Sequence, residues 1–386
     1  MSEVHEPYKV YLADVSYFSG KLEAYLRYKE IPYERIEINA KIGVEEVYKH
    51  TGILKVPAVK TADGLWMKDT TPMLDWFEKK YPKHPVIPDD PTLGFVSKLI
   101  EDYADEWCWR SAMYFRWRDP ANSDYLAQRI GKEVLGHWPI PTKYAGKYFK
   151  YRQKKIFMYG DGLTNKSEPI IRQQYFDLLD SLDTLLTETP YLLGNTVTLV
   201  DIAMMGPFFR HYFCDPEPAK IMRDRYPRVL EWVVKVWNAK ASQQQETSRI
   251  SDFSDKGWEN ILKEISQVYI PYLVRNAQAW KAKEKRFDFE MHNVILPNLP
   301  VIQYRVYCLE VLEKLYNSLD PDAKNNVDKI FKPYGSLQLD TGISSGLDSE
   351  YQLPLAKRSK PVGLLEKITI ILSGTPWDTP KRFRQP

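Results

Sequence analysis

The sequence predicts an α/β domain followed by an all-helical domain, and two patterns carry this prediction. Over residues 9–80, short strand-like runs alternate with helical segments and end in two consecutive strands and a helix. Beyond a proline-rich segment, amphipathic runs of helical period follow one another to about residue 240. The first pattern is typical of a small sheet that mixes parallel and antiparallel strands, and the second of a helical bundle.

Local signals mark the elements of the α/β domain. Asp63-Gly64 is a strong signal for a tight hairpin turn between two strands. Thr70 is placed to cap the helix that follows, and Pro72 is tolerated in its first turn. In order, the predicted elements are strand 9–13, helix 19–28, strand 33–38, helix 45–49, strand 55–60, strand 65–67 and helix 70–80.

Helices dominate the middle of the chain. The run 199–212 is apolar nearly all round, which predicts a buried helix, and other helices are predicted at about 92–118, 170–187 and 228–239. The four prolines between residues 82 and 91 mark a linker. We therefore expect a first domain at 1–82, a linker at 83–91, a helical domain at 92–240 with a basic insertion near 119–165, and a C-terminal extension at 241–386.

The extension is expected to be partly helical and to end in an irregular tail. A polar segment precedes it, and the tail is rich in Gly, Pro and Ser, which disfavours a packed core. Residues His292-Asn293 are expected to turn one strand back into another. The expected parts are a polar linker at 241–248, helices at 258–283 and 301–319, strands at 286–291 and 294–296, and an irregular tail at 333–386.

Composition and charge exclude several classes of protein. Lys and Arg total 54 and Asp and Glu total 51, so the net charge of +3 disfavours a dedicated nucleic-acid binder. Three dispersed cysteines without a CxxC pair disfavour a disulfide framework. We expect no transmembrane segment, because no stretch of 18 apolar residues occurs. The first residues lack the basic flank and apolar run of a signal peptide, so we expect a cytoplasmic protein.

The first candidate for chemistry is the segment 14–21, which lies between a predicted strand and a predicted helix. Hydroxyls at Ser16 and Ser19 stand at the positive end of that helix, where an anion is favoured. The alternative is that one of these serines only caps the helix.

Three further pairs of residues stand at the ends of predicted elements. Val56-Pro57 enters a strand, where a proline is either an ordinary strand start or, in the cis form, a shaped backbone site. Asp69-Thr70 opens a helix whose free amides and hydroxyl suit a carboxylate, although an ordinary cap has the same pattern. Thr198 and Asp201 form a pattern similar to a capping box, which we interpret as structural.

In this order and spacing, together with the segment YLLGNTVTLVDIAM, these features resemble the glutathione transferase superfamily. The resemblance covers about residues 8–240. It implies a thioredoxin-like N-terminal domain, a helical-bundle C-terminal domain, glutathione as co-substrate and a homodimer. The C-terminal extension is not explained by the resemblance.

The resemblance also implies roles for individual residues. Ser16 matches the catalytic hydroxyl, with Tyr17 as the alternative. Family members often have Pro at the position of Phe18 and Arg at that of Gly20, so this chain departs from the family at both. The remaining matches are the Val56-Pro57 step for the cysteinyl part of glutathione, the Asp69-Thr70 pair for its γ-glutamyl end, and Thr198 and Asp201 for the structural cap of the helical domain.

An electrophile pocket is expected between the two domains. Tyr103, Trp107, Arg110 and Tyr114 are spaced so that they share one face of the predicted helix 92–118. An aromatic face with one arginine suits an aromatic, anionic co-substrate. The alternative is that these rings pack in the helical core or in a dimer interface.

A basic segment at 143–155 has six Lys or Arg residues and no acidic residue. It is interpreted as a contact site for an anionic partner or, alternatively, as a solvated charged loop. The six histidines show no metal-ligand spacing, so no metal site is expected.

These observations lead to three functional hypotheses. The first is a glutathione-dependent transferase, or a related thiol-transfer or lyase enzyme, that activates the glutathione thiolate for attack on a small electrophile. The second is a catalytically silent binding or scaffold protein of the same fold. The third is a ligand carrier that uses the aromatic pocket without turnover. The Val56-Pro57 and Asp69-Thr70 steps favour the first, whereas the changes at Phe18 and Gly20 favour the second.

Overall fold

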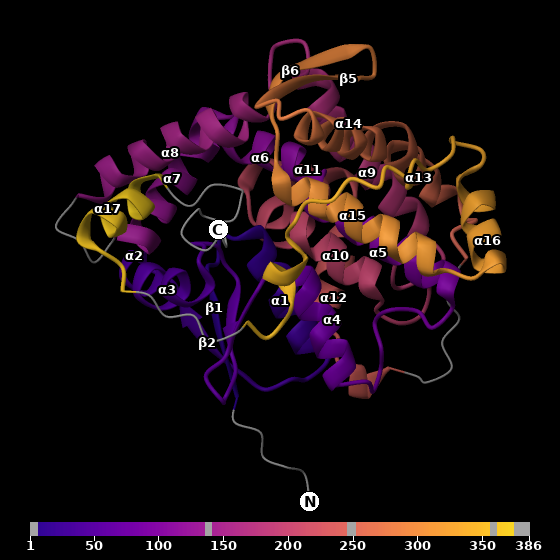
Figure 1. The fold of residues 1–386 in the computed structure, drawn as a ribbon, viewed down its shortest axis with the longest axis horizontal. Coiled ribbons are helices and arrows are strands. Elements are labelled where there is room, and N and C mark those ends of the chain that lie inside the picture. The colour runs from indigo at the N-terminus through magenta and orange to yellow at the C-terminus, as the bar shows by residue number, and fades with distance from the viewer. Residues whose placement is uncertain (1–6, 136–140, 245–251, 356–360, 374–386) are drawn as a thin grey trace, which may run out of the picture.

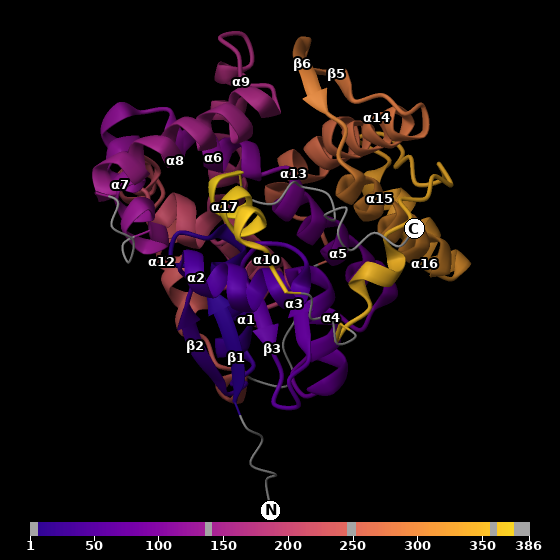
Figure 2. The same cartoon turned by 60° about the vertical axis from the view of Figure 1, so that its left-hand side comes forward.

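A computed structural model describes residues 7–135, 141–244, 252–355 and 361–373 of the chain. The small sheet and its helices lie together at one side, and the helices of the middle and C-terminal parts of the chain pack beside them (Figures 1 and 2). One contiguous hydrophobic core runs through the α/β domain, the helical domain and the extension.

The sheet is mixed, as predicted. Its four strands lie in the order β2-β1-β3-β4; β1 pairs parallel with β2 and antiparallel with β3, and β3 pairs antiparallel with β4. Gly64 in the β3–β4 turn has a φ of 82°, a conformation that glycine adopts readily. The strands are β1 (Tyr8–Leu12), β2 (Tyr33–Glu37), β3 (Ala58–Lys60) and β4 (Trp66–Lys68).

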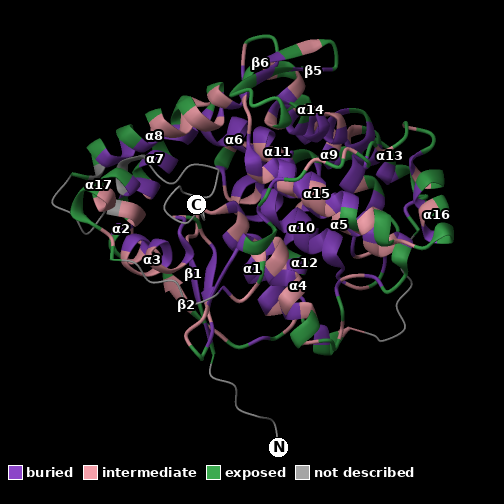
Figure 3. Cartoon of the chain, viewed as in Figure 1, coloured by how far each residue is buried: buried purple, intermediate pink, exposed green. Residues whose placement is uncertain are grey.

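Two longer helices and three short segments complete this domain. Helix α1 is buried along nearly its whole length (Figure 3), and it contacts α4 of its own domain and α10, η3 and α12 of the helical domain. The predicted helix 70–80 is present with the same bounds. The segments are α1 (Tyr17–Tyr28), α2 (Ala40–Ile42), the π-helical turn η1 (Gly43–Tyr48), α3 (Lys49–Thr51) and α4 (Thr70–Lys80).

The helical domain differs from the prediction where a single helix was expected over 92–118. Two residues, Trp107 and Cys108, interrupt it and separate α5 from α6. The buried helix predicted from residue 199 is present as α10, and it continues into a π-helical turn, η3. The elements are α5 (Pro91–Glu106), α6 (Trp109–Trp117), α7 (Pro120–Leu135), α8 (Thr142–Phe157), α9 (Glu168–Leu185), α10 (Leu199–Pro207), η3 (Phe208–Phe213), α11 (Pro216–Arg225) and α12 (Pro227–Asn238).

The basic segment 143–155 is not a charged loop, because it forms most of helix α8. Ala145 and Phe149 are buried on its inner face, four residues apart. A Cβ atom on Gly146 would lie 2.8 Å from the carbonyl oxygen of Ala127, so glycine allows α8 to pack closely on α7. The helix therefore buries one face and exposes its lysines on the other.

The extension packs on the helical domain. Helices α15 and α16 contact α5, and α13 contacts α9. His292 and Asn293 both have positive φ and turn β5 into β6, as predicted. The elements are α13 (Glu259–Glu264), η6 (Ile265–Tyr269), α14 (Ile270–Lys281), β5 (Arg286–Met291), β6 (Val294–Pro300), α15 (Gln303–Ser318), α16 (Pro321–Phe331), η7 (Asp348–Tyr351) and α17 (Leu364–Ser373).

Two of these elements fall in the segment that was expected to be irregular. A 3-10 turn, η7, and a helix, α17, occur after residue 333. Residues 245–248 of the predicted linker and residues 356–360 and 374–386 of the predicted tail lie outside the described residues.

A buried ion-pair cluster joins α1 to α5. The ammonium group of Lys21 lies 2.8 Å from an oxygen of Glu101 and 2.5 Å from one of Asp105, and the Lys21 side chain is fully buried. Thr71 donates its hydroxyl to the same two carboxylates, at 3.1 and 3.3 Å. Because an unpaired charge is costly in such a place, this cluster fixes the position of α1 against the helical domain.

Replacing Lys21 with Met leaves two buried carboxylates without their shared cation. We expect Lys21→Met to lower the free energy of unfolding by about 3–5 kcal/mol in urea denaturation at neutral pH. Glu101 still pairs with Lys98 at 3.0 Å in this variant, so the second substitution Asp105→Asn, which removes the other buried carboxyl group, should restore part of the loss. Equal stability of Lys21→Met and the wild type would contradict this account of the cluster.

The same cluster predicts a pH dependence of stability. Burial raises the pKa of Asp105 from its ordinary 3.8 to about 8, against the opposing effect of Lys21. Since the folded-state pKa is the higher one, the contribution of this group is fully present below about pH 4 and is lost as the pH rises through about 8. The unfolding free energy of the wild type, minus that of Asp105→Asn, should therefore fall over this pH range. A difference that is constant or rises would contradict the assignment.

Candidate active site

A cavity of about 470 Å³ lies where the two domains and the extension meet. We call it the main cavity, because the predicted site residues line it. The loop before α1, the start of β3 and the start of α4 form its floor. Helices α6, α7 and α8 form one wall, and residues of α15, η7 and α17 form another. The predicted residues Ser16, Val56, Pro57, Asp69 and Thr70 all line this cavity, so the structure brings them together.

Ser16 is the N-cap of α1. Its hydroxyl oxygen accepts a hydrogen bond from the backbone N–H of Ser19 at 3.3 Å, and its hydroxyl donates to the carbonyl oxygen of Val56, also at 3.3 Å. The Ser16 residue is extended, with φ −89° and ψ 127°, as an N-cap requires. Its hydroxyl therefore lies at the positive end of a helix and beside the Val56-Pro57 step, whose peptide bond is cis.

Tyr17 also lines the main cavity, but its hydroxyl is bonded inside the protein. Its hydroxyl donates to the carbonyl oxygen of Ala104 at 2.5 Å, and the residue is 1% exposed. A Cβ atom on Gly206 would lie 2.6 Å from the Tyr17 ring, so glycine is needed for this packing. Burial holds the pKa of Tyr17 well above its usual range. The Tyr17 hydroxyl therefore holds α1 against α5.

Asp69 and Thr70 begin helix α4. Asp69 is the N-cap, with a φ of 70°, and its carboxylate accepts a hydrogen bond from the hydroxyl of Tyr304 at 2.7 Å. Burial raises the pKa of Asp69, and the Tyr304 hydrogen bond opposes that effect. The Thr70 residue is 2% exposed. The first turn of α4 thus presents one carboxylate and free helix amides to the cavity.

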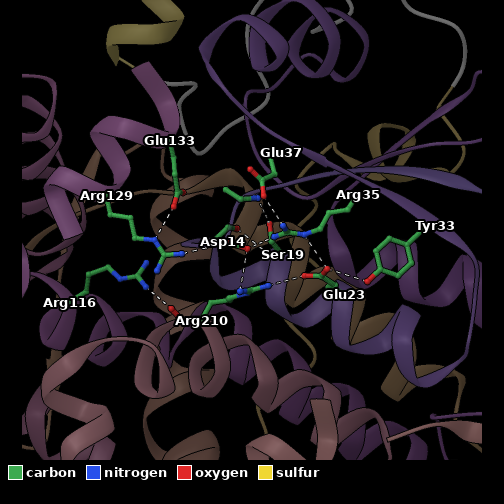
Figure 4. A network of polar contacts seen from close by, with 12 residues as sticks. Asp14, Ser19, Glu23, Tyr33, Arg35, Glu37, Arg116, Arg129, Glu133 and Arg210 are labelled. Atoms are coloured by element: carbon green, nitrogen blue, oxygen red, sulfur yellow. Dashed lines mark hydrogen bonds and ion pairs between the residues drawn. The ribbon is translucent and has the colours of Figure 1, made fainter. Parts of the chain in front are cut away.

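Arginines of the helical domain surround the loop that carries Ser16 (Figure 4). Asp14 lies 3.3 Å from Arg210 and 3.6 Å from Arg129, and it also pairs with Arg35. Arg116 donates to the carbonyl oxygen of Val15 at 2.6 Å. These contacts anchor the loop against the helical domain.

The departure at Gly20 has a physical explanation. A Cβ atom on Gly20 would lie 2.6 Å from Cγ of Arg210, so the Arg210 side chain fills the space. Its guanidinium pairs with Glu23 of α1 at 2.9 Å. Sequence reasoning missed Arg210 and Arg116, because nothing in the local sequence shows which distant arginine packs on α1.

The face predicted for the electrophile pocket does not line the main cavity. Tyr103, Trp107 and Arg110 line a second cavity, of about 510 Å³, together with α9 and α13. Tyr114 donates its hydroxyl to Glu168 at 3.2 Å. Tyr103, before the interruption at Trp107-Cys108, and Arg110, after it, thus still share one face, but that face is turned toward α9 and α13 and not toward the main cavity.

A different aromatic wall lines the main cavity. Phe18 and Trp109 stack with an interplanar angle of 17° and centroids 6.2 Å apart. Their faces lie beside the Ser16 segment, which makes an apolar subsite next to the polar one. The other apolar rings and side chains of this wall are Met113, Trp117, Ile130, Val134, Phe149, Ile156 and Phe157.

Thr198 and Asp201 have a structural environment. The Asp201 carboxylate accepts hydrogen bonds from the backbone N–H and hydroxyl of Thr198, at 2.9 and 3.0 Å. It also accepts from the Leu192 N–H and the Trp232 indole N–H, both at 2.9 Å. This buried carboxylate ties α10 to the loop before it and to α12.

Over 7–135, 141–244, 252–355 and 361–373, no group of three or more His, Cys, Asp or Glu side chains is placed to hold a metal ion. Within those same ranges, none of the helices combines the length and apolar character needed to span a membrane. The lysines of α8 point away from the cavity, and Lys150 pairs with Asp124 at 2.6 Å.

Comparison with known families identifies both domains. Residues 10–85 match the family model described as glutathione S-transferase, N-terminal domain. Residues 149–234 match the model described as glutathione S-transferase, C-terminal domain. A comparison with curated proteins gave no match.

Three solved structures with a similar chain trace illustrate the range of source and of TM-score. A glutathione S-transferase from Methylobacterium radiotolerans, in complex with glutathione sulfonate, is 17% identical, covers 60% of this chain and 90% of its own, and has a TM-score of 0.38. Poplar glutathione transferase F1 is 14% identical, with 67% and 98% covered and a TM-score of 0.39. The β-etherase LigF from Sphingobium sp. strain SYK-6 is 17% identical, with 60% and 95% covered and a TM-score of 0.41.

Proposed function

Because the chain belongs to the glutathione transferase superfamily, we propose that it binds glutathione in the main cavity and activates its thiol for attack on a small apolar or aromatic electrophile. The observation that carries this proposal is the place of the Ser16 hydroxyl. It stands at the start of α1, beside Val56, between the polar start of α4 and the Phe18–Trp109 wall.

Each part of the cavity has a role in this proposal. The backbone of Val56 holds the cysteinyl part of glutathione, and Asp69 with the first turn of α4 holds its γ-glutamyl end. The Ser16 hydroxyl turns from the Val56 carbonyl oxygen to the thiolate sulfur and donates to it. The thiol proton leaves to solvent, the sulfur forms a bond to the electrophilic carbon, and the leaving group departs with its bonding electrons.

The Ser16 hydrogen bond and the helix end are together strong enough to lower the pKa of the glutathione thiol. A thiol with a pKa near ~8.5 is mostly protonated at neutral pH, and the thiolate is the nucleophile. Lowering that pKa by about two units requires ~2.7 kcal/mol of preferential thiolate stabilisation. One hydrogen bond to an ionised group contributes ~1.5–3 kcal/mol, and a helix N-terminus adds ~0.3–1 kcal/mol. Ser16 and α1 together therefore account for the shift.

The Ser16→Ala variant tests the thiolate role. We expect kcat/KM for conjugation of an activated aryl halide to fall about 10- to 100-fold, because a hydrogen bond of ~1.5–3 kcal/mol to the thiolate is lost. The pKa of the bound glutathione thiol, followed by thiolate absorbance in the ultraviolet, should rise by about one to two units. Ser16→Thr keeps a hydroxyl and should retain most of the activity. Turnover that is unchanged in Ser16→Ala would contradict the role of Ser16.

The Trp109→Ala variant tests the apolar wall. Loss of a stacked aromatic partner should raise KM for an aromatic electrophile by about 3- to 10-fold, since such pairs contribute ~0.5–1.5 kcal/mol. The dissociation constant for glutathione should change little, because Trp109 belongs to the apolar wall and not to the polar groups assigned to glutathione. Trp76→Ala is a matched control, as Trp76 is a half-buried tryptophan of α4 outside the main cavity. An equal rise in both variants would show that the effect is not specific to the wall.

Cellular setting and assembly are part of the same proposal. We infer a cytoplasmic protein that works as a homodimer, which is what the superfamily resemblance implies. Sedimentation of the purified full chain distinguishes a dimer from a monomer of 45.3 kDa. Isothermal titration with reduced glutathione separates the transferase from the alternative, a silent binding protein: absence of binding would favour the latter.

A further inference from the structure

The extension reaches into the main cavity at three places. Tyr304 of α15, Tyr351 of η7 and Ile370 of α17 all line it. The chain after η7 also pairs with the sheet, because the N–H of Leu355 donates to the carbonyl oxygen of Trp66 on β4 at 2.8 Å. These residues lie far from Ser16 and Asp69 in the sequence and outside both matched family domains.

The most direct contact is between Tyr304 and Asp69. The Tyr304 hydroxyl donates to Oδ2 of Asp69 at 2.7 Å. The ring of Tyr304 is held in turn by Tyr351, with centroids 5.7 Å apart, and by Tyr307, at 6.0 Å. The extension thus fixes the Asp69 carboxylate, and helix α4, which follows Asp69, presents it to the main cavity.

A second contact holds the neighbouring lysine. The ammonium group of Lys68 lies 3.5 Å from Oε2 of Glu350 and 5.3 Å from the ring centroid of Tyr351. The side chains of Lys68 and Glu350 are only 3% and 9% exposed. Because Lys68 and Asp69 are adjacent, η7 and α15 together fix both ends of this two-residue segment.

We propose that the extension is a working part of the glutathione site, in which Tyr304 is a positioning residue that orients the Asp69 carboxylate toward the α-ammonium group of the γ-glutamyl end. This inference rests on the proposed function. Glu350 and Tyr351 support it by holding Lys68 and the Tyr304 ring.

The chemistry of the pair explains why such a residue is needed. A carboxylate must be ionised and correctly aimed to receive an ammonium group, and burial disfavours the ionised form. A phenol hydroxyl donates one hydrogen bond to one carboxylate oxygen, which favours the ionised form and leaves the other oxygen for the ligand. The site therefore gains an oriented acceptor without a competing positive charge at Tyr304.

The test compares two ligands in two variants. Tyr304→Phe removes only the hydroxyl, and Tyr307→Phe removes a hydroxyl from the same ring cluster as a matched control. Each purified full-length variant is titrated calorimetrically with reduced glutathione and with glutaryl-cysteinylglycine, which is glutathione without its α-amino group. Tyr304→Phe should weaken glutathione binding about 5- to 20-fold, because a hydrogen bond that orients a charged group is lost. Its affinity for the analogue, and both affinities of Tyr307→Phe, should change less than about twofold.

The outcomes separate this inference from the proposed function. Wild-type protein that does not bind glutathione would overturn both. Wild-type binding with unchanged affinity in Tyr304→Phe, or an equal loss for both ligands, would overturn only the role of Tyr304. In an Asp69→Asn background, Tyr304→Phe should have no further effect on glutathione binding, and a full additional loss would also overturn the role.

One measurement needs no variant. If the extension is part of the site, saturating glutathione should slow amide hydrogen exchange of residues 348–355 in the wild-type chain. The analogue without the amino group should slow it less. Exchange that is the same with and without bound glutathione would overturn the inference.

Discussion

The buried charge of Lys21 is the constraint on which the rest of the structure depends. A lysine with no exposed side-chain surface is stable only when its partners are in place, and these are Glu101 and Asp105 of α5. The pairing sets how α1 lies on the helical domain. It therefore sets where the first residue before α1, Ser16, meets the main cavity. The position of the proposed nucleophile-activating hydroxyl follows from an ion pair one and a half turns away.

With α1 fixed in this way, one side of the main cavity is polar and the other is apolar, because different parts of the chain form them. The sheet side offers backbone groups, Asp69 and helix amides, which suit a charged peptide-like ligand. The α6 and α8 side offers stacked rings, which suit an apolar partner. Arg116 of α6 and Arg210 of η3 hold the loop before Ser16 from the helical-domain side. A thiolate formed at this boundary has the Ser16 hydroxyl and the start of α1 on one side and an apolar reactant on the other.

The sequence predicts most of the local structure and less of the site. Asp63-Gly64 and the helix 70–80 are governed by local turn and capping chemistry, so their positions follow from the residues themselves. The interruption at Trp107-Cys108 has no proline or glycine to mark it, and no local pattern shows that the face of Tyr103 and Arg110 is covered by α9 and α13. Arg210 fills the space above Gly20 through tertiary packing alone, which no local pattern reveals.

The extension links binding to the stability of a segment far along the chain. β4 is an edge strand, and the contact of Leu355 with Trp66 covers part of its open side. The same stretch carries Glu350 and Tyr351, which hold Lys68 and the Tyr304 ring. If Tyr304 orients Asp69 for a ligand, then a ligand bound to Asp69 must stabilise the docked extension by the same free energy, since the coupling between two sites is reciprocal. A cap on the sheet edge and a wall of the binding site are then one structural element.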